Sequence, residues 1–183
     1  MERTEAKKLL AENVSNRNIR SHSVAVAAIM EGLAEKLGGD KDTWWLTGIL
    51  HDLDYEKTST RIEKHGLETA ELLEGKVAEE IIYAIKAHNG VHTGIGAKSN
   101  MDIALIASDA LSGLIISTAL IMPSKKLSEV TVESVMKKFK KKDFAKAVSR
   151  EKIMTCQRLN LSQEEFLGIG LAALCKVSEE MGL

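Results

Sequence analysis

The chain has 183 residues, of which 44% are hydrophobic and 28% charged, and its formal net charge is -1. This length is enough to bury a sizeable core within one domain, and the near-neutral charge argues against a general nucleic-acid or membrane-surface binder. One proline and 13 glycines favour helices over a turn-rich sandwich or barrel.

The cysteines and the first residues both bear on the compartment. Cys156 and Cys175 form no CxxC pair and no even framework, which indicates a reducing environment rather than disulfides or zinc. The first residues, 1–8, are too charged for a secretory signal. We therefore expect a cytoplasmic protein.

Apolar residues recur at helical spacing along most of the chain, and no segment shows sustained strand alternation. The expected helices cover about 2–14, about Ser21 to Gly38, Asp40 or Asp42 to about Leu53, Thr60 (in a capping box) to Gly75, 77–88, 103–122, two basic helices after Pro123, and a last helix opened by the capping box at 162–165. A glycine-rich loop is expected over 89–99. The pattern predicts an all-α fold.

The segment 103–122 is apolar enough to resemble a membrane span, with Asp109 as its one charge. A central Asp costs about 2.5–3.5 kcal/mol on membrane insertion, and Ser108 and Ser112 lie beside it. We therefore expect the central buried helix of a helical domain.

His51 and Asp52 lie side by side at the end of the apolar run 44–50. Burying an imidazole or a carboxylate without a partner is costly, and a divalent metal is the simplest partner for both. The adjacency therefore predicts a metal site.

Three further side chains belong to apolar helical stripes: His22 with Val26 and Ile29, His88 with Ile81 and Ile85, and Asp109 with Leu105. An apolar stripe faces the core, so these side chains should point inward. Each alone fits a hydrogen-bonded core residue, but together with the His-Asp pair they indicate a metal site.

The order His22, His51-Asp52, Asp109 resembles the H…HD…D signature of the HD superfamily of metal-dependent phosphohydrolases. The segments 48–54 and 107–113 are similar to an uncharacterised branch of predicted hydrolases in it. The resemblance implies a single HD-type domain over 1–183, with a metal-binding core at about 21–115 and C-terminal helices at about 128–183. It also implies that His22, His51, Asp52 and Asp109 bind one metal.

Some proteins of that superfamily hold a second metal on further histidines between the HD pair and the last Asp. His88 suits this role better than His65, whose helix is polar and for which surface exposure is an equal alternative. His92 is expected to be incidental, or at most a substrate contact. Nitrogen and oxygen ligands favour Mn, Fe, Mg, Co, Ni or Zn.

Such an ion activates water and polarises a phosphoryl oxygen. In this mechanism we expect Asp52 to hold the metal. Asp54 or Glu56 could orient the water, and Asp54 is equally plausible as a loop cap. A phosphate also needs cations, and eight lie in segment 137–152. Most should form a solvated face, with Lys125, Lys126 and Arg150 as the candidates for phosphate binding.

The sequence thus predicts a phosphohydrolase acting on a small phosphate ester or a nucleotide. The alternatives are a di-iron oxygenase of the same fold and a non-catalytic metal- or nucleotide-binding module. We expect no stable nucleic-acid complex and no membrane association. The central or the last helix could form a homodimer face.

Overall fold

The computed structural model describes all residues from 1 to 183 and contains helices and turns but no strand. The helices, in chain order, are α1 (Arg3–Asn13), α2 (Arg17–Leu37), α3 (Lys41–Leu50), α4 (Tyr55–Thr58), α5 (Leu67–Leu73), α6 (Glu79–His88), α7 (Gly90–Thr93), α8 (Asn100–Leu120), α9 (Val132–Lys140), α10 (Arg150–Met154), α11 (Gln163–Lys176) and α12 (Ser178–Met181). Short 3-10 turns lie at Ile62–Lys64, Leu127–Glu129 and Thr155–Leu159. The predicted all-α fold is confirmed.

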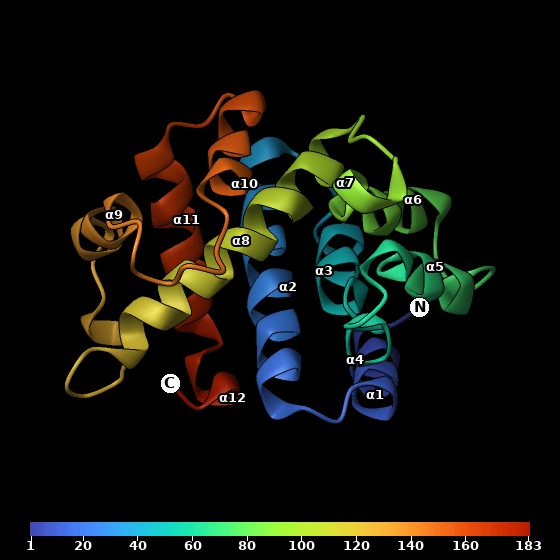
Figure 1. Cartoon of the computed structure of the whole chain (residues 1–183), viewed down its shortest axis with the longest axis horizontal. Helices are drawn as coiled ribbons and strands as arrows, with labels where there is room; N and C mark the ends of the chain where they lie inside the picture. The colour runs from blue at the N-terminus through green and yellow to red at the C-terminus, as the bar shows by residue number, and fades with distance from the viewer.

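The two long helices α2 and α8 cross at the centre of the molecule (Figure 1). α2 packs between α3 and α11, and α8 packs on α2, α6, α10 and the last 3-10 turn. A large apolar cluster surrounds α2, α8 and α11, and a smaller one lies between α1, α3, α5 and α6. The two clusters meet along α2 and α3, and this junction positions the polar site described below.

Local sequence signals explain most helix boundaries. The Asn16 side chain accepts a hydrogen bond from Asn18 at the start of α2, and Gly38 ends the helix in the left-handed conformation (φ 73°). Asp40, rather than Asp42, caps α3 by accepting from the amide of Thr43. The capping box predicted at Ser162 is present, and α8 has one that pairs Ser99 with Asp102.

The predicted helix over residues 60–75 is wrong in its first half. The Thr60 capping box does not form, and residues 62–64 make only a 3-10 turn. His65 is extended and Gly66 is left-handed (φ 82°), so α5 begins at Leu67. This break turns the His65 side chain toward the interior. The expected glycine-rich loop also contains the short helix α7.

α8 is the one helix long and apolar enough to cross a membrane. Two thirds of its most apolar window, 67%, are buried inside the fold, and α2, α6, α10 and α11 cover it. It is therefore the central core helix predicted for residues 103–122, and it begins three residues earlier, at Asn100.

Candidate metal centre

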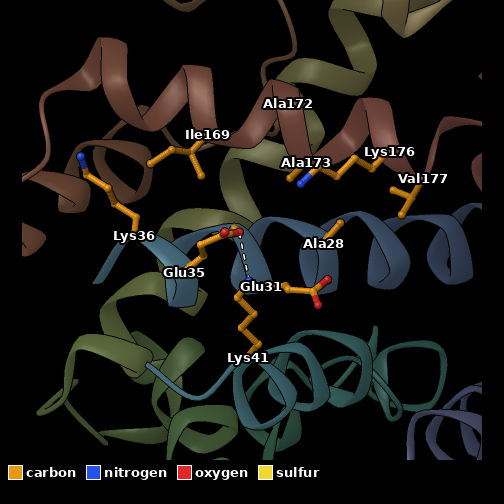
Figure 2. Close-up of a pocket in the computed structure, with 11 residues that line it drawn as sticks. Ala28, Glu31, Glu35, Lys36, Lys41, Ile169, Ala172, Ala173, Lys176 and Val177 are labelled. Atoms are coloured by element: carbon orange, nitrogen blue, oxygen red, sulfur yellow. Dashed lines mark ion pairs between the residues drawn. The ribbon is translucent and has the colours of Figure 1, made fainter. Parts of the chain in front are cut away.

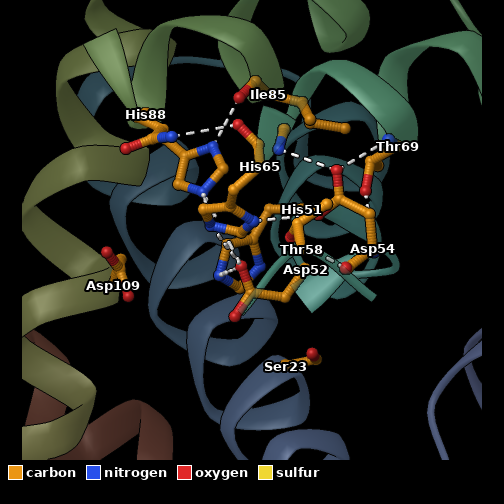
Figure 3. A network of polar contacts seen from close by, with 12 residues as sticks. Ser23, His51, Asp52, Asp54, Thr58, His65, Thr69, Ile85, His88 and Asp109 are labelled. Carbon is orange, nitrogen blue, oxygen red and sulfur yellow. Dashed lines mark hydrogen bonds and ion pairs between the residues drawn. The ribbon is translucent and has the colours of Figure 1, made fainter. Parts of the chain in front are cut away.

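Histidines and carboxylates from α2, α6 and α8, and from the turns after α3 and before α5, converge where α2, α3, α6 and α8 meet (Figure 3). Four of the five histidines in the chain belong to this cluster. His22 lies on α2, His51 and Asp52 directly follow α3, His65 lies in the turn before α5, His88 is the last residue of α6, and Asp109 is in the middle of α8. His92, in α7, is exposed and takes no part.

Close packing between α2 and α3 fixes the first part of this cluster. Gly48 lies against the α2 backbone so tightly that a Cβ there would come within 2.6 Å of the Ala27 Cα. His51 follows one turn later, on the same side of α3 as Gly48. The missing side chain at Gly48 therefore allows the end of α3 to approach the helix that carries His22.

Asp52 links two groups of three side chains, which we name the first triad (His22, His51, Asp52) and the second triad (Asp52, His65, His88). Within each triad one ligand atom per residue lies within 4.8 Å of the others. Asp109 joins the first triad through His22, at 3.2 Å from Nε2 to Oδ1.

The carboxylate of Asp52 faces all four imidazoles. Its Oδ2 lies 3.6 Å from Nε2 of His22. Its Oδ1 lies 3.2 Å from Nε2 of His51, 3.4 Å from Nε2 of His65 and 3.6 Å from Nε2 of His88. A side chain in this position can serve both triads at once.

Hydrogen bonds at the far side of each ring determine what the rings present to the centre. Nδ1 of His51 lies 2.7 Å from the carbonyl oxygen of Gly48, and Nδ1 of His88 contacts that of Ile85. A carbonyl oxygen only accepts, so in both rings Nδ1 carries the proton. The Nε2 atoms of His51 and His88 therefore present lone pairs to the centre when the rings are neutral.

The same holds for the other two rings. The Ser112 hydroxyl donates to the carbonyl of Asp109 (2.9 Å) and so accepts from Nδ1 of His22 (3.0 Å). Nδ1 of His65 donates to the carboxylate of Asp54 (2.8 Å). This support by outer partners, which fixes tautomer and ring orientation, is typical of metal-binding histidines.

The electrostatics of the centre keep its carboxylates ionised. Burial works to raise the pKa of Asp52, but the surrounding histidines, His51 foremost, hold it well below its usual range. Burial also works to raise the pKa of Asp109, but the hydrogen bond and charge of His22 have the larger effect and lower it. Burial lowers the pKa of His51 to about 4. Near neutral pH the cluster therefore contains buried anions beside a neutral imidazole, which a divalent cation would compensate.

The donor set fits a metal ion. Nε2 of His51 is fully buried and has no hydrogen-bond partner. Nε2 of His65 and Nε2 of His88 lie only 3.0 Å apart. If both rings are neutral and carry their proton on Nδ1, the lone pairs of the two Nε2 atoms point at each other across this distance. Imidazole nitrogens and carboxylate oxygens without a thiolate suit a borderline or hard divalent ion.

Asp54 has a different role from the one predicted for orienting water. Its Oδ1 accepts from His65, and its Oδ2 accepts from the amides of Gly66 (2.8 Å) and Thr69 (2.9 Å). Both oxygens are thus engaged at the start of α5, which matches the alternative of a loop cap. Glu56 is also directed elsewhere, since it accepts from Ser15 and Asn16 before α2.

The predicted phosphate-binding residues lie away from the cluster. α8 runs from Asp109 to Leu120 before the loop of Lys125 and Lys126, which places that loop roughly 16 Å along the axis. Arg150 donates to six backbone carbonyls between Lys138 and Val148. Its guanidinium therefore holds a loop together and does not face the site.

Lys152 is the basic residue that sequence reasoning did not single out. Its Nζ lies 3.4 Å from Oδ2 of Asp109. In the sequence it was one of eight cations expected to form mainly a solvated face. Helical spacing could not have separated it from Arg150, because the loop before α10 decides which of the two faces α8.

A cavity of about 270 Å³ opens onto the first triad. Its lining consists of Asn18, Ile19, His22, Asp52, Tyr55 and Asp109. A larger cavity, of about 600 Å³, lies between α2 and α11 (Figure 2). No member of either triad lines it, so the smaller cavity is the one that gives access to the candidate metal centre.

A comparison with known protein families gives one match for the chain. The family model described as HD domain matches residues 19–154. The match includes both triads and Asp109, and it extends beyond the expected core of 21–115 as far as α10. Searches of curated proteins and of solved structures gave no match for the chain.

Proposed function

Because this chain belongs to the HD domain family, we propose that it is a metal-dependent phosphohydrolase that cleaves a small phosphate ester or a nucleotide. One observation carries the proposal: four supported imidazoles present Nε2 toward a carboxylate, Asp52, that two triads share. Such a donor set beside an open cavity suits hydrolysis assisted by one or two divalent ions.

The first triad with Asp109 would hold one ion, and the second triad would hold another through Asp52. An ion bound there lowers the pKa of water and polarises a phosphoryl oxygen. Candidate ions are Mn, Fe, Mg, Co, Ni and Zn, because the ligand types alone do not discriminate among them.

The protein side chains would bind and orient the substrate. His22 and Asp109 are partly exposed at the cavity, so a phosphate group would enter on their side. Tyr55, which is 41% exposed, lines the same cavity together with Ile19 and Asn18, and these residues would contact the rest of the ester. A cavity of about 270 Å³ favours a small substrate, since most ligand pockets measure about 300–1,000 Å³.

The test is phosphate release from a panel of nucleotides and small phosphate esters, with Mn²⁺ or Co²⁺ added. We expect turnover on part of the panel and its loss in Asp52→Ala, with the circular dichroism spectrum unchanged. No turnover by metal-loaded protein on any ester would contradict the proposal. Bound iron with oxygen uptake would favour the oxygenase alternative, and tight nucleotide binding without turnover would favour a binding module.

A further inference from the structure

The ammonium of Lys152 is the one lysine or arginine group that pairs with an aspartate of the centre. It reaches Asp109 from α10, at the side of Asp109 opposite His22: His22 contacts Oδ1 and Lys152 contacts Oδ2. The lysine side chain is 37% exposed, so the ammonium lies at the boundary between the centre and solvent.

The placement of Lys152 is built into the fold. Arg150 gathers the carbonyls of the loop 138–148 through hydrogen bonds of 2.6–3.4 Å, and the Ser149 side chain caps α10 by accepting from the amide of Lys152 (3.2 Å). The same loop packs closely on α8, where a Cβ at Gly113 would lie 3.1 Å from the Val148 side chain. α10 is therefore held against α8 one turn from Asp109.

The centre otherwise offers a phosphate anion few donors. Each imidazole uses Nδ1 in a hydrogen bond to the surrounding protein, so its Nε2 faces the centre as a ligand atom, and the carboxylates of Asp52 and Asp109 repel an anion. Asn18 and Tyr55 line the cavity with neutral donors only. An ammonium supplies three donors and a positive charge, which is what the oxygens of a phosphate group that face away from a metal require.

We propose that Lys152 binds the reacting phosphate group of the substrate. The inference rests on the proposed phosphohydrolase function and adds a substrate-contacting residue to it. The ammonium moves from Asp109 Oδ2 to a non-bridging phosphate oxygen when substrate enters, while Arg150 acts as a positioning residue that holds α10 in place. The competing role is purely local: Lys152 would only neutralise the charge of Asp109.

Lys152→Met tests the proposal against Lys146→Met, a change in the same basic segment whose ammonium pairs only with the exposed Asp143. With Mn²⁺-loaded protein we expect the inhibition constant of inorganic phosphate and the KM to rise about 10- to 100-fold in Lys152→Met, since a charge-assisted hydrogen bond is lost. Lys152→Arg should restore part of the affinity, and Lys146→Met should match the wild type.

Calorimetric titration with Mn²⁺, combined with phosphate inhibition and KM, separates the two roles. If Lys152 only neutralises Asp109, then Lys152→Met will bind Mn²⁺ more tightly and leave phosphate inhibition and KM unchanged, which would overturn the proposal. The wild type could also hydrolyse no ester and yet bind phosphate, in calorimetry, in a way that depends on Lys152. That result would support the role of Lys152 in phosphate binding and reject the proposed reaction. A wild type that neither binds phosphate nor hydrolyses any ester would overturn both.

Discussion

The two triads share Asp52 but stand on different kinds of element. His22 and Asp109 lie on α2 and α8, each 21 residues long, and their side chains are 24% and 25% exposed. His65 and His88 lie beside turns, and their side chains are only 8% and 2% exposed. Under the proposed function, this difference predicts that substrate would meet His22 and Asp109, whereas His65 and His88 would lie behind Asp52. Four experiments test this division and the packing beneath it, in order of expected effect.

Asp52→Asn should have the largest effect because Asp52 belongs to both triads. An amide keeps the shape but removes the charge that would hold the ions. Since a catalytic ion contributes several kcal/mol to the transition state, we expect kcat to fall more than about 10³-fold. Elemental analysis should show loss of metal from both triads. Retention of wild-type metal content would contradict the assignment of Asp52 as the shared ligand.

His65→Gln and His22→Gln should separate the triads. We expect His65→Gln to lose the ion of the second triad and keep the other, with kcat lowered at least about tenfold because a two-metal clamp is reduced to one ion. His22→Gln should weaken the ion that faces the cavity and lower activity further. Metal content per chain and kcat, measured together, check this order. His92→Gln, at an exposed position on α7, is the matched control. Equal metal content and equal kcat in all three variants would contradict the distinction between the two triads.

Asp54→Asn tests the outer support of the second triad alone. Asp54 orients His65 and accepts from two amides of α5, so its loss should weaken metal binding about 10- to 100-fold. Calorimetric titration with Mn²⁺ measures the change, which we expect in the second binding event only. Asp143→Asn, at an exposed carboxylate that pairs with Lys146, should change nothing. Loss of the first binding event would show that the triads are coupled.

Gly48→Ala should have the smallest effect on chemistry and a clear effect on stability. The added Cβ would meet the α2 backbone at 2.6 Å, and such overpacking destabilises a core by about 1–3 kcal/mol. Urea unfolding measures the loss. Gly96→Ala, where a Cβ meets nothing within 4 Å, should change the free energy of unfolding by less than about 0.5 kcal/mol. An unaltered midpoint in Gly48→Ala would show that α2 and α3 can separate without penalty.

The inward direction of His22, His88 and Asp109 could be predicted because it follows from helical periodicity. Each lies on a stripe of apolar residues, and such a stripe must face the core. The end of α2 at Gly38, the start of α3 after Asp40 and the start of α11 after Ser162 followed equally from local capping signals. These signals are local, so the sequence alone contains them. The other ends of α2 and α3 were predicted less well, since α2 begins at Arg17 rather than near Ser21 and α3 ends at Leu50 rather than at about Leu53.

His65 and Asp54 were predicted less well because their roles depend on a break in the chain. The expected continuous helix over 60–75 would have placed His65 on a polar face, whereas the extended His65 and left-handed Gly66 turn it inward. Asp54 then captures both the imidazole and the first amides of α5. No periodic pattern marks such an arrangement, since it forms between segments that meet only in the fold.

The helical class, the core helix α8 and most residues of the candidate metal centre could be predicted from the sequence, since periodicity and the adjacency of His51 and Asp52 are properties of the chain. The fold was needed to show which side chains surround Asp52, which triad opens to the cavity, and which cation contacts Asp109. Arg150 and Lys152 are two residues apart on one short helix, yet one binds backbone carbonyls and the other contacts Asp109. The physical reason is that the packing of the preceding loop on α8 sets the orientation of α10, and that packing joins residues distant in the chain.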